Sequence, residues 1–266
     1  MSAPSPSNPP ISGAPPASDG PAIRVEGLWK SFGGNVVLKG IDLDFPKGTT
    51  TVILGGSGSG KSVLMKHLIG LMKPDEGRIL VEGQDLAKLS DRELNLFRMR
   101  FGMVFQWAAL FDSMTVGENV AFPLREHRPQ LSEAQIAAAV ADKLELFGIG
   151  GTEGKYPADL SGGMRKRVGL ARAIVLEPRI VLYDEPTTGL DPITTNYVDE
   201  MILRAKETLG VTSVVISHDI GSAFNVADYI AFLYEGAIVA YGPPATVRAS
   251  EHEFVAKFLS TWFKKN

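Results

Sequence analysis

The sequence predicts an α/β fold with a mostly parallel β-sheet. Short apolar runs typical of strands alternate with segments of helical periodicity, the pattern of parallel strands joined by helices. One such strand, residues 50–54, leads directly into a glycine-rich loop, and residues 61–72 then carry apolar side chains at helical spacing. A strand, a glycine loop and a helix in this order are what a phosphate-binding loop requires. We therefore expect phosphate groups to bind at one edge of this sheet.

The predicted strands and helices follow one another along most of the chain. Strands are expected at residues 23–28, 36–45, 50–54, 78–81, 102–105, 180–183 and 213–217, with a hairpin over 229–241. Besides 61–72, helices are expected over 132–147, over 164–176, and from a cap at Asp191 to a stop at Gly210.

The middle of the chain, residues 106–160, is mainly helical and predicts an inserted helical subdomain with bounds near 107 and 164. Its clearest helix starts with a capping box formed by Ser132 and Gln135. One apolar stripe of this helix is expected to face a core. The stripe consists of Ile136, Val140, Leu144 and Phe147.

The two ends of the chain differ from the main domain, which is expected to span residues 21–250. Residues 1–20 are rich in Pro, Ser and Ala, and predict a disordered leader without the pattern of a signal peptide. Residues 251–266 predict an amphipathic helix. Its apolar face, expected to pack on this subunit or on a partner, carries Phe254, Phe258, Leu259 and Trp262.

The overall composition excludes several classes of function. The formal net charge of −3 lacks the basic excess with which nucleic-acid-binding proteins neutralise phosphates, so no nucleic acid partner is expected. The absence of cysteine excludes disulfides, thiolate metal sites and cysteine nucleophiles. No apolar run approaches the ~20 residues that cross a bilayer.

The glycine loop is the strongest chemical signal. Its glycines allow backbone N–H groups to close around phosphates at a helix N-terminus. Lys61 is expected to reach the β- and γ-phosphates of a nucleotide, and the Ser62 hydroxyl to ligate Mg²⁺. The alternative, a flexible Gly/Ser turn, is disfavoured by the flanking strand and helix. The expected nucleotide-binding residues are Gly55, Gly56, Ser57, Gly58, Ser59, Gly60, Lys61, Ser62 and Val63.

Two further segments fit the same site. The apolar run 180–183 delivers Asp184 and Glu185 to the C-terminal end of a strand, where ligands bind in open α/β sheets. Asp184 is suited to hold Mg²⁺ through water, and Glu185 to orient an attacking water. Ser161, Gly162 and Gly163 precede a helix; from the residues alone, a plain N-cap and a second anion-binding site are equally compatible with them.

With these motifs in order, residues 23 to about 250 resemble the ATP-binding subunits of ABC transporters. The resemblance implies a RecA-like P-loop NTPase core with an antiparallel β subdomain and the inserted helical subdomain. It assigns Walker A to 55–62, the Q-loop to Gln106, the signature to 160–164, Walker B to 180–185, the D-loop to 189–191, the switch histidine to His218, and an adenine-stacking aromatic to Phe32. Taken singly, a Phe or a His is more often structural. Met164 departs from the Gln common at the end of the signature.

The resemblance also implies an ATPase mechanism that uses ATP and Mg²⁺ and needs two copies of the chain. In such a homodimer, ATP on one Walker A loop is completed by the signature of the other subunit. The implied catalytic residues are Glu185, His218, Gln106 and Lys61; the metal ligands are Ser62, Gln106 and Asp184; and the residues acting in trans are Ser161, Gly162, Gly163 and Asp191.

The region after Gln106 looks like that of Mla-type ATPases of lipid transporters. Ala109-Leu110-Phe111 and Pro123-Leu124-Arg125-Glu126-His127 carry the likeness. It implies phospholipid transport between bacterial membranes, maintaining outer-membrane lipid asymmetry, by a peripheral protein at the cytoplasmic face of the inner membrane. The implied partners are a transmembrane permease (MlaE-like), an MCE protein (MlaD-like) and a STAS-domain protein (MlaB-like). Leu110, Phe111 and Met114 suit a permease groove, or else the core of the subdomain.

One alternative is the ATPase of a different ABC importer or exporter. Two others belong to a different class: a soluble ABC ATPase of DNA repair or translation, and a non-catalytic nucleotide sensor. Repair proteins usually carry a long coiled coil between Walker A and the signature, and translation factors usually carry two cassettes; neither feature is present. The sensor is disfavoured because Glu185 and His218 are intact.

Overall fold

The computed structural model describes residues 20–263, so the predicted leader lies outside the described residues except for Gly20. The strands are β1 Ile23–Phe32, β2 Asn35–Phe45, β3 Thr50–Leu54, β4 Glu76–Val81, β5 Gln84–Asp85, β6 Phe101–Val104, β7 Ile180–Asp184, β8 Thr212–Ser217, β9 Tyr229–Tyr234 and β10 Ala237–Gly242. The helices are α1 Lys61–Leu68, α2 Asp91–Arg98, α3 Val116–His127, α4 Glu133–Leu146, α5 Gly162–Ile174, α6 Pro192–Leu209, α7 Ile220–Val226, α8 Pro244–Arg248 and α9 Glu253–Phe263.

Two sheets form the core. The larger has the order β10-β9-β3-β8-β7-β6, and all its neighbours are parallel except β10 and β9, which confirms the predicted mostly parallel sheet. The smaller sheet has the order β2-β1-β4-β5 and is antiparallel, as the family resemblance implied. In the larger sheet Leu54 pairs with Ser217 and Asp184 with Ile216, so the loops after β3, β7 and β8 leave the same edge together.

The larger sheet is covered on both faces, which explains its nearly continuous apolar strands. Along β3, Val52 and Leu54 face the cluster that includes helices α5, α6 and α7, whereas Ile53 faces the cluster that includes α1 and the antiparallel sheet. All three side chains are completely buried. The strand that carries the glycine loop is therefore fixed from both sides.

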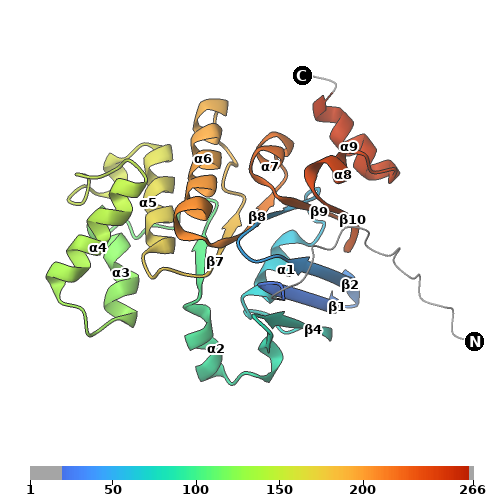
Figure 1. Cartoon of the computed structure of the whole chain (residues 1–266), viewed down its shortest axis with the longest axis horizontal. Coiled ribbons are helices and arrows are strands. Elements are labelled where there is room, and N and C mark those ends of the chain that lie inside the picture. The colour runs from blue at the N-terminus through green and yellow to red at the C-terminus, as the bar shows by residue number, and fades with distance from the viewer. Residues whose placement is uncertain (1–19, 264–266) are drawn as a thin grey trace, which may run out of the picture.

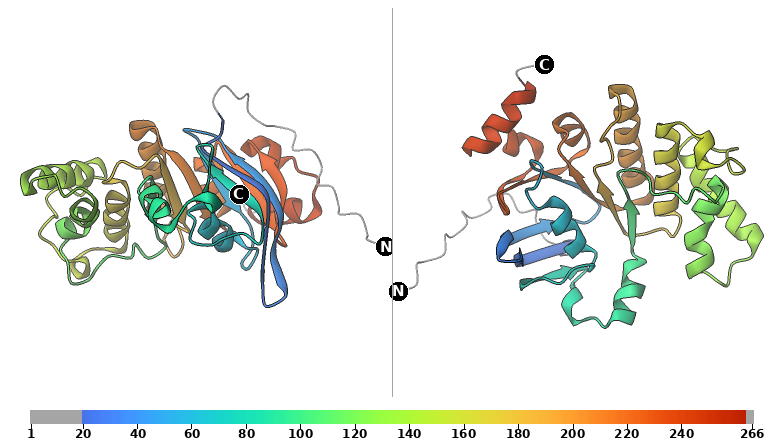
Figure 2. Two further views of the ribbon diagram at one scale, coloured as in Figure 1. Left: turned by 90° about the horizontal axis from the view of Figure 1, so that it is seen from below. Right: turned by 180° about the vertical axis from the view of Figure 1, so that it is seen from behind.

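Helices α3, α4 and α5 pack against one another at one end of the molecule, away from the antiparallel sheet (Figures 1 and 2). The expected subdomain, about residues 107–164, includes α3, α4 and the start of α5. The predicted capping box of Ser132 and Gln135 is present at the start of α4. The stripe of Ile136, Val140, Leu144 and Phe147 is buried, as expected. Helix α5 also packs against β6, so it connects the subdomain to the larger sheet.

Some helix bounds differ from the prediction. Helix α1 ends at Leu68 instead of residue 72, because Gly70 adopts a left-handed conformation with φ 65°. Helix α5 begins at Gly162, two residues earlier than expected, with Ser161 as its cap. Helix α2 was not predicted. It is short and mostly polar, although Leu94 and Phe97 are buried on one face and Ser90 and Glu93 form a capping box.

The C-terminal helix α9 packs on its own chain. Phe258 meets the ring of buried Phe232 edge-on, with ring centroids 5.0 Å apart, and Leu259 is 3% exposed. The side chain of Trp262 lies against α7, where a methyl group on Gly221 would come within 3.2 Å of the indole. Within residues 20–263, no helix is long and apolar enough to cross a membrane.

Candidate functional site

The glycine loop joins the buried end of β3 to the N-terminus of α1, and two of its glycines are required by close backbone approach. A Cβ atom on Gly55 would lie 2.3 Å from the carbonyl oxygen of Leu233. Gly60 has φ 106°, a conformation that disfavours other residues, and its Cβ would lie 2.9 Å from Leu38. The loop therefore presents its backbone N–H groups at a helix start, an arrangement that binds phosphate.

Lys61 lies inside this loop and is 7% exposed. Its ammonium group donates hydrogen bonds to the carbonyl oxygens of Gly55 and Gly56, at 2.8 and 3.0 Å. Burial lowers the pKa of Lys61, and the negative charges of Glu185 and Asp184 oppose that shift. The ammonium is thus a buried, locally held cation beside the acids at the end of β7.

The acid pair lies at the end of β7, where the chain turns sharply. Glu185 has φ 48°, and its N–H donates to the carbonyl of Ile216 on the neighbouring strand at 2.9 Å. Burial, and then the negative charge of Glu185, raise the pKa of Asp184, while Lys61 acts in the opposite direction. The arrangement concentrates negative charge at the edge of the sheet where the glycine loop also lies.

The Glu185 carboxylate is held at both oxygens. Its Oε2 lies 2.7 Å from Nδ1 of His218 and accepts a hydrogen bond of 3.1 Å from the Thr188 hydroxyl. Its Oε1 lies 3.9 Å from the Lys61 ammonium. Thr188 was not predicted as a site residue, because a hydroxyl three positions after an acid is no signal by itself. The side chain of Glu185 is therefore fixed in orientation at the surface of a cavity.

This cavity has a volume of about 480 Å³ and brings together much of the predicted site. Its lining consists of Gly56, Ser57, Gly58, Lys61, Ser62, Gln106, Glu185, Thr188, His218 and Phe258. Phe258 belongs to α9, and the sequence indicated only an apolar packing role for it. Helix α9, near the end of the chain, thus contributes to the cavity that the glycine loop lines.

Other predicted residues lie outside the cavity lining. Five of them are direct sequence neighbours of residues that line it: Asp184, Gly55, Ser59, Gly60 and Val63. Phe32 is 45% exposed at the end of β1, and the ammonium of Lys30 lies 5.5 Å from the centre of its ring.

The predicted trans residues are at exposed helix starts. Ser161 caps α5 by accepting from Met164 N–H at 3.3 Å, and Asp191 caps α6 by accepting from Ile193 and Thr194 N–H groups at 3.0 Å. Gly162 and Gly163 form the first turn of α5. None of these residues lines the cavity of its own chain. In the single chain, Ser161 thus serves as the plain helix cap that was one of its two expected roles.

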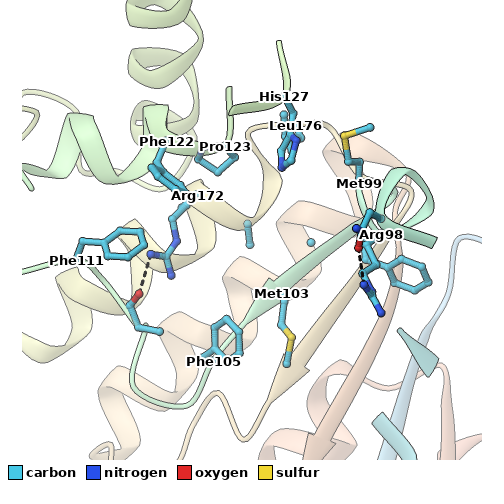
Figure 3. Close-up of a pocket in the computed structure, with 15 residues that line it drawn as sticks. Arg98, Met99, Met103, Phe105, Phe111, Phe122, Pro123, His127, Arg172 and Leu176 are labelled. Carbon is cyan, nitrogen blue, oxygen red and sulfur yellow. Dashed lines mark hydrogen bonds between the residues drawn. The ribbon is translucent and has the colours of Figure 1, made fainter. Parts of the chain in front are cut away.

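A second cavity, of about 390 Å³, lies between the larger sheet and the inserted subdomain; we call it the subdomain groove (Figure 3). Its lining is mainly apolar and includes Met103 and Phe105 near β6, and Phe111, Phe122 and Pro123 near and on α3. Phe111 is 43% exposed. Of the other two residues expected in such a groove, Leu110 packs against the core cluster instead, and Met114 does not line the groove.

The sequence and the structure are both similar to those of known proteins. The family model described as "ABC transporter" matches residues 38–188. The "Probable ribonucleotide transport ATP-binding protein mkl" of Mycobacterium leprae is 44% identical over 241 residues, which cover 91% of this chain and 69% of that protein. The "Intermembrane phospholipid transport system ATP-binding protein MlaF" of Haemophilus influenzae is 41% identical over 237 residues, 89% of each.

Among solved structures, a dimeric ATP-binding cassette, MJ0796, in "a post-hydrolysis state" bound to ADP and Pi, matches with a TM-score of 0.75 and 30% identity. The match covers 83% of this chain and 98% of that one. Family, fold and a cavity built around a phosphate-binding loop all agree. The chain belongs to the ABC transporter family, as an ATP-binding subunit that hydrolyses ATP.

Proposed function

We propose that this ATPase powers phospholipid transport between bacterial membranes as part of an MCE-type system. The similarity to MlaF carries the proposal, because it extends over 89% of both chains rather than over the nucleotide-binding motifs alone. The groove-lining segment around Phe111 and Pro123 is also the one whose sequence resembles Mla-type ATPases.

For the chemical step, we assign the attacking water to the Glu185 carboxylate. His218 and Thr188 hold one oxygen of this carboxylate, so its orientation is set before a nucleotide binds. Lys61 pairs with the β- and γ-phosphates, and the N–H groups of the glycine loop stabilise the charge that develops during transfer. Phe32 stacks on the adenine, at the exposed end of β1.

The residues assigned to Mg²⁺ fit this ion. Ser62 and Gln106 line the cavity, and Asp184 ends the strand beside it. All three offer oxygen ligands, which Mg²⁺ prefers, and Mg²⁺ in such sites takes its remaining ligands from water and phosphate. When bound, the ion neutralises charge on the phosphates. Burial and the negative charge of Glu185 raise the pKa of Asp184, so a neighbouring cation favours its ionised form.

The nucleotide site is completed by a second copy of the chain. Ser161, Gly162 and Gly163 lie at an exposed helix start outside the cavity of their own chain, as does the cap Asp191. A helix N-terminus with free N–H groups suits the γ-phosphate of a nucleotide on a facing subunit. The dimeric state of the similar cassette MJ0796 supports this assignment.

The subdomain groove is assigned to a transmembrane permease. Its exposed aromatic side chain, Phe111, and its apolar walls suit an amphipathic segment of such a partner. The assembly then consists of two ATPase copies at the cytoplasmic face of the inner membrane, an MlaE-like permease, an MlaD-like MCE protein and an MlaB-like STAS-domain regulator.

A second cargo must be compared, because the relative with 44% identity is named for ribonucleotide transport. The cavity and the groove described above contact nucleotide and permease, so neither specifies the transported molecule. The match to MlaF covers 89% of both chains, whereas only 69% of the relative named for ribonucleotide transport is covered, and this difference favours phospholipid.

The test is purification of the tagged chain from detergent-solubilised membranes of its host, followed by reconstitution into liposomes. Co-purification of a permease and an MCE protein, with ATP-dependent transfer of labelled phospholipid that is abolished by Glu185→Gln, is the expected result. ATP-dependent movement of labelled ribonucleotide would favour the second cargo. Recovery without any membrane protein would overturn the transport assignment.

A further inference from the structure

We propose that Arg172, on the signature helix α5, is a positioning residue that fixes Gln106 in the nucleotide cavity, the name used here for the cavity of about 480 Å³ that the glycine loop lines. The inference rests on the role assigned above to Gln106 as a ligand of Mg²⁺. Arg172 itself does not line that cavity. It acts through the two residues that follow Trp107, Ala108 and Ala109, which we call the Q-loop turn.

The Q-loop turn has an unusual backbone. Ala108 and Ala109 adopt φ angles of 60° and 48°, in the left-handed region that residues with a Cβ atom rarely occupy. Two consecutive alanines in this conformation require support from their surroundings. Within the turn, the N–H of Ala108 donates to the carbonyl of Phe105 at 3.0 Å.

Arg172 supplies support from outside the turn. Its two terminal nitrogens donate to the carbonyl oxygens of Ala108 and Ala109, at 2.7 and 2.8 Å. A planar guanidinium can bind two adjacent carbonyls at once, which a lysine ammonium cannot do with the same geometry. No carboxylate among residues 20–263 forms an ion pair with Arg172, so these carbonyls are its principal polar partners.

Two further contacts hold the same segment. Gly169 lies one helical turn before Arg172 on α5. A Cβ atom on Gly169 would lie 3.1 Å from the Cβ of Ala108, so the Q-loop turn packs directly on the helix. On the other side, buried Asn119 of α3 accepts from the N–H of Phe111 at 2.8 Å and donates to its carbonyl at 3.0 Å. The Q-loop turn therefore packs on α5, and α3 holds the chain two residues beyond it.

These contacts determine where Gln106 lies. On its N-terminal side, β6 is fixed in the sheet by pairing of Val104 with Tyr183. On its C-terminal side, Arg172 fixes the chain two residues later. Figure 3 shows Arg172 reaching from α5 toward the turn beside Phe111, at the wall of the subdomain groove. Arg172 thus lines the groove and contacts the segment that joins the groove to Gln106 in the nucleotide cavity.

The experiment compares Arg172→Met and Arg172→Lys with a matched control, Arg204→Met. Arg204 also donates to a backbone carbonyl, that of Leu146 at 2.9 Å, but far from the Q-loop turn in sequence. Two quantities are measured on the full-length chain: hydrogen exchange of the peptide covering 105–111, and the Mg²⁺ concentration that gives half-maximal ATPase activity.

We expect Arg172→Met to speed exchange in 105–111 and to raise the half-maximal Mg²⁺ concentration about tenfold, the usual effect of losing an outer contact to a metal ligand. ATP binding measured without Mg²⁺ stays at the wild-type level. Arg172→Lys, which keeps the charge, gives a smaller shift of the same sign. Arg204→Met changes neither quantity.

If both Arg172 variants match Arg204→Met in exchange and in Mg²⁺ dependence, the proposal is overturned. Should Arg172→Met fail to fold, the same comparison with Arg172→Lys decides. Gln106→Ala separates the proposal from the assignment on which it rests: if that variant leaves the Mg²⁺ dependence unchanged, Gln106 is not a ligand, and exchange in 105–111 alone then tests whether Arg172 fixes the turn.

Discussion

The two cavities described above differ in the chemistry of their linings. The nucleotide cavity is lined by backbone of the glycine loop and by charged or polar side chains at the ends of parallel strands. The subdomain groove is lined mainly by apolar and aromatic side chains from or near β6, α3 and α5, and also by residues of α2; Arg98 and Arg172 are among its few charged groups. The first suits phosphate and a cation; the second suits an apolar protein surface.

This difference decides how each site responds to change. In the nucleotide cavity each proposed role depends on the charge or polarity of one group, so removing that group is expected to abolish a step. In the groove, binding is expected to depend on apolar contact, to which an exposed aromatic side chain contributes most.

Glu185→Gln is expected to have the largest effect. The amide retains the size of the side chain but cannot accept the proton of the attacking water, so turnover should fall about a hundredfold or more while ATP binding persists. ATPase assays and binding of a fluorescent ATP analogue measure the two quantities. Glu200→Gln, at an exposed position of α6, is the control. Near-normal phosphate release by the Glu185 variant would remove Glu185 from its role.

Mixing two inactive variants tests the composite site. Lys61→Ala disables the glycine loop and Ser161→Arg disables the signature, so each alone should be inactive. In a mixed dimer one site combines an intact loop with an intact signature, and an equal mixture should recover up to about a quarter of wild-type activity, because symmetric dimers mix at random. Full activity of Ser161→Arg alone would show that the signature does not act across the dimer.

Phe111→Asp tests the groove. A charge at this exposed ring should reduce recovery of the permease with the tagged chain about tenfold, because it places an unpaired charge in an apolar contact. Basal ATPase activity of the isolated chain should change less than twofold. Leu96→Asp, on α2 and outside the groove lining, is the matched control at 57% exposure. Equal loss of the permease in both variants would contradict a specific groove.

Asp199→Asn is expected to give the smallest effect, a change in the free energy of unfolding that depends on pH. Asp199 is 3% exposed and accepts from the hydroxyl of Ser222 on α7, the helix that follows His218. Burial raises its pKa above the ordinary value of 3.8, while hydrogen bonds from Ser222 and Asn225 oppose this effect.

The folded protein therefore binds this proton more readily than the unfolded chain, and Asp199 makes stability fall as pH rises from 3.8 through the raised pKa. Above that window the destabilisation no longer changes with pH. Urea unfolding of wild type and Asp199→Asn at acidic and neutral pH measures it. The variant should gain stability relative to wild type as pH rises; a constant difference would contradict the raised pKa.

The sequence predicted the nucleotide cavity far better than the groove. Two unbroken stretches of sequence, Gly55 to Ser62 and the acids at 184–185, supply most of this site. Each stretch directly follows an apolar strand, so the local pattern was enough to place both at one edge of the sheet. Thr188, Phe258 and Arg172 carry no such pattern. Their importance arises from contacts made in the folded chain, and nothing near them in the sequence indicates those contacts.

The family resemblance indicated the groove, but it could not predict which of its apolar residues are exposed there and which pack against the core. Leu110 and Phe111 are adjacent and similarly apolar, yet Leu110 packs into the core and Phe111 remains exposed at the groove. The left-handed turn at Ala108 and Ala109 precedes these two residues and is held by Arg172 of α5, while Asn119 of α3 bonds the backbone of Phe111, so contacts with distant helices set the path of this segment.

By itself, the sequence determined the fold class, the phosphate-binding loop and the acid pair, because strand periodicity and glycine chemistry are local properties. Only the tertiary structure decided that His218 and Thr188 orient Glu185, that α9 returns to the cavity, and that α5 holds the chain beyond Gln106. The physical reason is that these arrangements depend on hydrogen bonds and packing between distant segments, whose geometry is set only when the sheet and its helices are assembled.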